Sequence, residues 1–84
     1  MTYSLQEAID LLDSVAAGIY PSRAEIVHGL VALALHTKPD DLDVVLLIAG
    51  LEQFVFGHVE KVSPELAERA GPTASRLRHA VGVH

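Results

Sequence analysis

Cysteine and tryptophan are both absent from this 84-residue sequence. Without cysteine no disulfide can form, and the Cys/His clusters that hold structural zinc are excluded as well. A chain of this length buries only about 60–65% of the surface that its unfolded form exposes, so its stability has to come from apolar packing. The absence of cysteine fits a reducing compartment, and the N-terminus "MTYSLQEAIDLL" has neither a basic residue nor an apolar signal core. We therefore expect a cytoplasmic protein.

Basic residues are also scarce. The chain has 6 lysines and arginines against 11 acidic residues, which gives a formal net charge of −5. Residues 1–60 hold nine acids and two bases, whereas residues 61–84 hold two acids and four bases. An acidic body repels a phosphate backbone. A helix-turn-helix is disfavoured too, because no base lies between Lys38 and Lys61, where a recognition helix would be. We expect no nucleic-acid partner.

Catalytic motifs are missing. There is no cysteine nucleophile, no Gly-x-Ser-x-Gly elbow and no glycine-rich loop ahead of a helix, and the five histidines lack ligand spacing. Glu25-x-x-His28 matches one half of the motif of di-iron bundles, which need two such motifs and two further glutamates. The chain has no second copy, and both residues fall on the polar arc of their expected helix, which we interpret as a solvated face. We predict no enzyme activity, no cofactor and no metal ligand.

Helix signals are present in quantity. Ser4-x-x-Glu7 and Ser22-x-x-Glu25 have the spacing of capping boxes, and apolar residues follow each at helical spacing. Gly18 suits a left-handed C-cap, Asp40 or Asp41 suits the N-cap of a third helix, and Ser63 suits an N-cap ahead of a proline at the first helical position. Strict alternation, the sign of a strand, is found nowhere.

These signals predict an all-α fold in a single domain spanning residues 1–84. We expect a compact helical bundle of three main helices plus two short C-terminal helices. The first two main helices have about fourteen residues each, and the central helix covers about residues 41–61. "GPT" at 71–73 should divide the C-terminal part into helices 64–70 and 73–81, the second one capped by Thr73.

The segment "LDVVLLIAGLEQFVFGHV" (42–59) contains only two full charges, Asp43 and Glu52. A membrane-spanning helix needs about 20 apolar residues, and the uninterrupted run here covers only residues 44–51, so we expect no membrane span. A helix that is apolar nearly all round is otherwise buried. Two helices of about fourteen residues and two short ones can cover one side of it well, and an uncovered apolar patch is rare in monomers. The simplest remedy is a second copy of the chain.

We therefore expect a non-enzymatic helical interaction module that forms a homodimer or higher homo-oligomer and has a possible protein partner. An adaptor, or an inhibitor or regulator of the immunity, antitoxin or phage type, would fit. The alternative is a sensor or carrier with an apolar pocket for a lipid-like ligand, and a metal enzyme built on paired Glu25/His28 motifs is a third hypothesis.

The self-association interface is expected on the central helix. Leu47, Phe54 and Phe56 should lie near the contact, with Gly50 and Gly57, seven residues apart, permitting close approach. Phe56 shares a strip with the charged Glu52, so it should be among the more exposed apolar residues of a lone chain. That the two glycines only make room for helices within one chain remains open.

Overall fold

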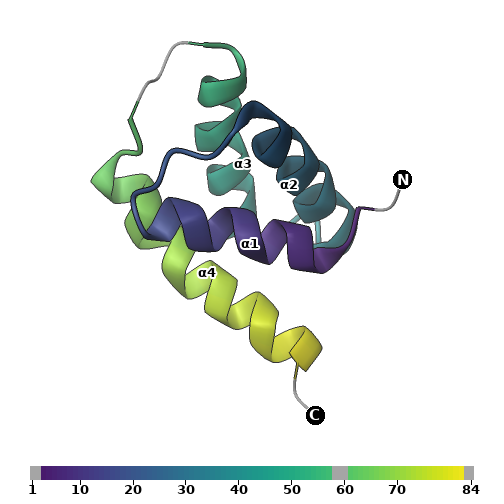
Figure 1. Cartoon of the computed structure of the whole chain (residues 1–84). Coiled ribbons are helices and arrows are strands. Elements are labelled where there is room, and N and C mark those ends of the chain that lie inside the picture. The colour runs from purple at the N-terminus through teal and green to yellow at the C-terminus, as the bar shows by residue number, and fades with distance from the viewer. Residues whose placement is uncertain (1–2, 58–60, 83–84) are drawn as a thin grey trace.

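The computed structural model describes residues 3–57 and 61–82, and every regular element in them is a helix (Figure 1). The helices are α1 (Leu5–Ala16), α2 (Arg23–His36), α3 (Leu42–Val55) and α4 (Pro64–Gly82). The all-α prediction is confirmed. The radius of gyration, 11.7 Å, is close to the roughly 12 Å expected of a compact chain of this length.

The capping residues begin the helices where the sequence predicts. The Ser4 and Ser22 hydroxyls accept hydrogen bonds from the backbone N–H groups of Glu7 and Glu25, at 3.4 and 3.2 Å. Asp41, rather than Asp40, caps α3, and the Ser63 hydroxyl accepts from an N–H in the first turn of α4 at 3.1 Å. These side chains satisfy donors that a helix start leaves without an intrahelical partner.

The central helix is shorter than predicted, because it ends at Val55 and not near residue 61. Phe56 is its C-cap, and Gly57 takes a left-handed φ of +79° while its N–H donates to the Phe54 carbonyl at 3.2 Å. Gly18 ends α1 in the same way, with φ +76°. A glycine in this conformation turns the chain out of the helix. Residues 58–60 of the predicted helix lie outside the described residues.

The two predicted C-terminal helices are one continuous helix, α4, with Pro72 inside it. Proline removes one intrahelical hydrogen bond, which is why a break was expected. The helix continues because Ala70, Ala74 and Leu77 bury an apolar stripe at helical spacing. Thr73 does not cap a new helix. It is buried, and its hydroxyl donates to the Arg69 carbonyl at 2.9 Å.

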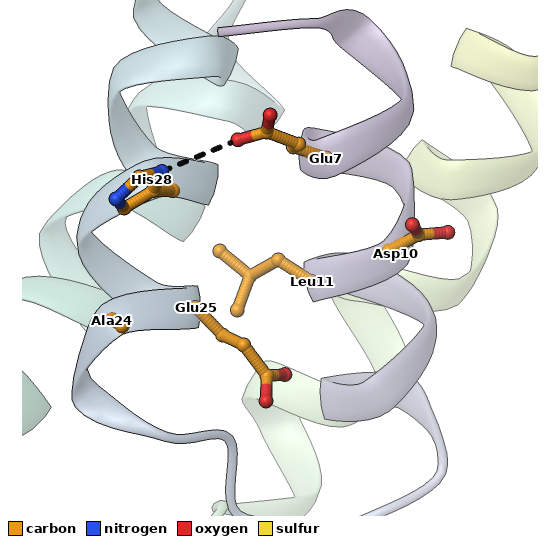
Figure 2. A pocket seen from close by; sticks show the side chains of 6 residues that line it. All are labelled: Glu7, Asp10, Leu11, Ala24, Glu25 and His28. Carbon is orange, nitrogen blue, oxygen red and sulfur yellow. Dashed lines mark ion pairs between the residues drawn. The ribbon is translucent and has the colours of Figure 1, made fainter. Parts of the chain in front are cut away.

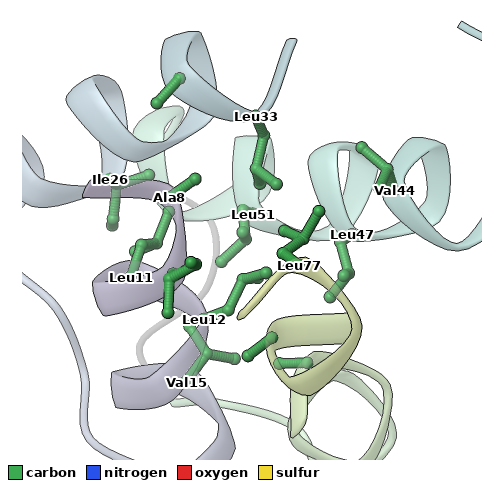
Figure 3. Close-up of a cluster of buried hydrophobic side chains, with 14 of the residues drawn as sticks. Ala8, Leu11, Leu12, Val15, Ile26, Leu33, Val44, Leu47, Leu51 and Leu77 are labelled. Atoms are coloured by element: carbon green, nitrogen blue, oxygen red, sulfur yellow. The ribbon is translucent and has the colours of Figure 1, made fainter. Parts of the chain in front are cut away.

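Each helix packs against two others, in the closed order α1–α2–α3–α4–α1. In Figure 1, α1 runs across the molecule with α4 on one side and α2 and α3 on the other. All four helices supply side chains to one hydrophobic core (Figure 3). Its large, fully buried members are Leu11, Leu12, Val15, Ile26, Leu33, Val44, Leu47 and Leu51.

Two glycines allow close helix packing at the contacts of α1 with α2 and of α3 with α4. A Cβ on Gly29 would lie 2.3 Å from Leu11 Cδ2 and 2.7 Å from Leu11 Cβ, so α2 approaches α1 closely at this point. A Cβ on Gly50 would lie 2.9 Å from Leu66 Cδ1, at the contact between α3 and α4. Gly50 therefore makes room within the chain, which is the role that the sequence left open.

Candidate functional site: the apolar outer face of α2 and α3

Large apolar side chains gather on the solvent side of α2 and α3. Eight large apolar side chains are exposed among the described residues, and six of them belong to these two helices or to the C-cap of α3. The other two, Ile19 and Tyr20, lie in the connector between α1 and α2. We call the six the apolar outer face: Val27, Leu35, Leu42, Val45, Leu46 and Phe56.

On α3 this face lies opposite the core. Leu47 and Leu51 point inward with no exposed surface, and Val44 and Phe54 are buried with them. Helical spacing places Leu42, Val45, Ala49 and Phe56 on the other side, where all four are exposed. Leu42 is 68% and Phe56 64% exposed. The expectation that Phe56 ranks among the most exposed apolar residues is confirmed.

The outer side of α2 is also apolar, and sequence reasoning did not single it out. Ile26, Gly29 and Leu33 face the core. Val27, Val31 and Ala34 follow one another at helical spacing on the far side, with Leu35 beside them at 64% exposure. The signal was in the sequence, because apolar residues surround nearly the whole of α2. Which of them stay outside depends on where α1 and α3 pack.

The five predicted interface residues do not share one surface. Leu47 is in the core, and Phe54 is 6% exposed, with its ring edge-to-face against Tyr20 at a centroid distance of 5.0 Å. Gly50 packs on Leu66, and Gly57 lies in the turn that ends α3. Leu47 and Phe54 thus pack within their own chain. Of the five, only Phe56 presents a large apolar side chain to solvent, and its contact with a second chain stays a prediction.

Charges are kept to the α4 side of α3. Two Arg76 nitrogens donate to the two Asp41 carboxylate oxygens at 2.8 and 3.1 Å, and Arg69 donates to Asp43 at 3.3 Å. The hydrogen bond from Arg76 lowers the pKa of Asp41, and the same bond raises the pKa of Arg76. On the outer side of α3 the one fully charged side chain is Glu52, which forms no ion pair within the described residues.

The pocket between α1 and α2, of about 380 Å³, contains the Glu25-x-x-His28 motif (Figure 2). His28 Nδ1 lies 3.5 Å from Glu7 Oε2, which is buried and has no hydrogen bond. Glu25 instead accepts a hydrogen bond from the Ser22 hydroxyl at 3.2 Å, and Figure 2 shows its carboxylate directed away from the His28 ring. Both residues of the motif therefore serve contacts within the chain.

Neither a cluster of metal-ligating side chains nor a membrane-spanning helix is found in the described residues. No group of three or more His, Cys, Asp or Glu side chains is placed there to hold a metal ion. No helix in residues 3–57 and 61–82 is long and apolar enough to cross a bilayer. Comparison of the chain with protein-family models, with curated proteins and with solved structures finds no significant match.

Proposed function

We propose that the protein is a non-enzymatic helical interaction module that self-associates through the apolar outer face of α2 and α3. One observation carries the proposal: six of the eight exposed large apolar side chains of the described residues belong to this face. Soluble monomers rarely expose large contiguous apolar patches, and such patches mark interaction sites. A role as an adaptor or as a regulator of another protein is compatible with it, with the same face as the contact surface.

The energetics favour association. The exposed parts of the six side chains amount to about three whole side chains per chain. Burying a large apolar side chain contributes about 1.5–3 kcal/mol, so two copies together would gain roughly 9–18 kcal/mol. The entropy lost on association is estimated at about 4–15 kcal/mol. The gain is large enough to support a dimer, with an affinity set by how well the two surfaces fit.

The alternative of a carrier for lipid-like ligands has less support. An apolar carrier would keep its surplus of apolar side chains around an internal cavity. The pocket between α1 and α2 is lined by Glu7, Asp10, Glu25 and His28, and the pocket between α3 and α4 by Lys61, Glu65 and Arg69 beside apolar residues. The surplus lies on the outer face instead, which favours a protein partner.

Nucleic acid and a secretory route do not form part of the proposal. Arg69, Arg76 and Arg78 are paired with the carboxylates of Asp43, Asp41 and Asp13, which leaves them poorly disposed toward phosphates. The absence of cysteine supports a reducing compartment such as the cytoplasm.

Light scattering on the purified protein tests the proposal. We expect a mass of about twice the 9.0 kDa of one chain at tens of micromolar. Phe56→Asp should leave each chain folded, because Phe56 is 64% exposed, but should weaken association by about 2 kcal/mol or more, roughly thirtyfold.

Ile19→Asp is the matched control, because Ile19 is 60% exposed but lies outside the apolar outer face. It should leave the mass unchanged. A wild-type protein that stays at 9.0 kDa under these conditions would remove the proposal, and so would a Phe56→Asp variant that dimerises as well as wild type.

A further inference from the structure

We propose that the part of α4 after Pro72, residues 73–82, is a clasp that opens and closes as one unit while the rest of the fold stays intact. The clasp is the end of α4 nearest the C-terminus in Figure 1, and its hinge is at Gly71 and Pro72. Three observations carry the inference, namely the residues at the hinge, the few apolar side chains that the clasp buries, and the ion pairs that hold it closed. The inference does not depend on self-association, because no residue of the apolar outer face takes part.

The hinge is a weak place in the hydrogen-bond ladder of α4. Pro72 has no N–H group, so the carbonyl of Glu68, on the same exposed side of the helix, receives no hydrogen bond from it. Gly71 has the poorest helix propensity after proline. The Thr73 hydroxyl donates to the Arg69 carbonyl at 2.9 Å, and bonds of this kind often bend helices. Three successive residues therefore weaken α4 at one level and divide it there.

The clasp buries few apolar side chains. Leu77 is the only large apolar residue in 73–80, and the other buried residues of this range are Thr73 and Ala74. Helices α1 and α3 each bury four large apolar side chains, and Leu77 belongs to the same core cluster (Figure 3). Segments with few buried apolar contacts open at a lower free energy than the core helices of a fold. The clasp should therefore open before α1 and α3 unfold.

Ion pairs at the surface hold the clasp closed on two sides. Arg76 donates to both carboxylate oxygens of Asp41, the N-cap of α3, at 2.8 and 3.1 Å. Arg78 pairs with Asp13 on α1. Both arginine side chains are about half exposed, so dissolved salt screens the two pairs. A rise in ionic strength should therefore shift the clasp toward its open state.

A groove of about 560 Å³ lies beside the hinge, between α4 and the first turn of α3. Of the described residues that line it, Asp43 is the only one from α3, and it pairs with Arg69 at 3.3 Å. Rotation of the clasp at Pro72 therefore breaks no apolar contact with α3 in this groove. Arg69 precedes the hinge, so its ion pair stays in place when the clasp opens. This pair is a natural control for the two pairs of the clasp.

Amide hydrogen exchange, measured residue by residue by NMR, tests the clasp. The amides of residues 76–78 report its opening, because they lie beyond the hinge and before the last turn, where any helix frays. The amides of residues 68–70 report α4 before the hinge, and those of α1 and α3 report the core. In the wild type we expect residues 76–78 to share one opening equilibrium that is more favourable than in either of the other groups. About 1 M NaCl should increase this opening severalfold.

Three variants test the parts of the clasp. Arg78→Gln removes one of its ion pairs and should increase the opening of residues 76–78 about 1.5–5-fold at low salt, with residues 68–70 unchanged. Arg69→Gln removes a similar pair before the hinge and should leave the opening of residues 76–78 unchanged. Pro72→Ala restores an N–H group to the ladder, so residues 68–70 and 76–78 should then open together.

The contrary outcomes are equally distinct. Residues 76–78 that exchange as slowly as α1 and α3 would overturn the proposal. Wild-type residues 68–70 that open together with 76–78 would also overturn it, because the whole of α4 would then be the opening unit. A Pro72→Ala variant that leaves the two groups separate would remove the hinge from Pro72. Equal effects of Arg69→Gln and Arg78→Gln would show that the ion pairs of the clasp do not hold it closed.

Discussion

The α1/α4 half and the α2/α3 half of the molecule supply the same core but differ in their outer faces. In the described parts of α1 and α4 no large apolar side chain is exposed, and an ion pair between Asp13 and Arg78 joins the two helices on the outside. Helices α2 and α3 also bury their inner sides, and together with the C-cap of α3 they still leave six large apolar side chains in solvent. The chain completes its core without the outer side of α2 and α3, so these side chains remain free for contact with a partner.

The largest expected effect is a difference in folding stability between substitutions on the inner side and on the outer side of α3. Leu47→Ala removes a fully buried side chain from α3 and should destabilise the fold by about 2–5 kcal/mol. Leu42→Ala makes the same chemical change on the outer side, where Leu42 is 68% exposed, and should change the stability of a single chain by no more than about 0.5 kcal/mol. Urea unfolding at a concentration where the chain is monomeric measures both. Equal losses would mean that the outer side is part of the core.

The next effect lies where the two halves meet. Gly29→Ala forces a Cβ to within 2.7 Å of Leu11 Cβ, an atom fixed to the backbone of α1, and should cost about 1–3 kcal/mol. Gly50→Ala meets only the end of the half-buried Leu66 side chain, which can rotate away. There the better helix propensity of alanine, up to about 1 kcal/mol, should offset the contact. The thermal or urea unfolding midpoints of the two variants measure these losses. Similar losses of stability at both sites would contradict the prediction that Gly29→Ala costs more than Gly50→Ala.

Local signals in the sequence predicted the helix starts, because capping is decided by three or four neighbouring residues. The helix ends were harder. Gly18 and Gly57 end their helices in the same way, but Gly57 is followed by further apolar residues, so the sequence pattern continues past the turn. At Pro72 the error was the opposite one: the sequence predicted a helix end that does not exist. The helix continues through the proline because Ala70, Ala74 and Leu77 are buried. Tertiary packing outweighs a local break in such a case.

The candidate site was predicted only in part, for a related reason. The strip holding Glu52 identified Phe56 as exposed, because a charge marks the solvent side of a helix. The local sequence pattern does not indicate whether Leu47 and Phe54 face the chain's own core or a partner, because α3 is apolar nearly all round. Which side chains of α3 face the core depends on which of its sides α2 and α4 cover. The exposed outer side of α2 was missed for the same reason.

Substitution of the glycines that end α1 and α3 should cost an intermediate amount of folding stability, and this amount should be the same in the two halves. Gly18→Ala and Gly57→Ala each place a side chain at a left-handed φ, +76° and +79°, with nothing within 4 Å of the new Cβ. The cost is then conformational alone, about 1–2 kcal/mol at each site. Asparagine tolerates this conformation better, so Gly18→Asn and Gly57→Asn should lose less. A much larger loss at Gly57, measured by urea unfolding, would show that the end of α3 makes contacts that the end of α1 lacks.

The smallest effect concerns Asp41 with Arg76, one of the ion pairs that link the two halves. Arg76 is half-exposed, so the pair should contribute only about 0.2–1 kcal/mol. The pKa of Asp41 is lowered in the folded chain, so the folded state binds its proton less readily than the unfolded state. The stabilisation is therefore complete above the unfolded pKa of about 3.9 and is lost as the pH falls through the lower folded value.

Asp41→Asn isolates this charge, because asparagine caps a helix about as well as aspartate and the start of α3 is kept. At pH 7 and low salt the variant should be less stable than wild type by the amount of the pair, and the difference should disappear at low pH and in about 1 M salt. Arg76→Gln should cost a similar amount, and the double variant little more than either one, because both single changes remove the same interaction. A loss in Asp41→Asn that persists at low pH would show that Asp41 acts through the helix cap and not through its charge. The charge of Asp41 would then contribute nothing to the link between the two halves.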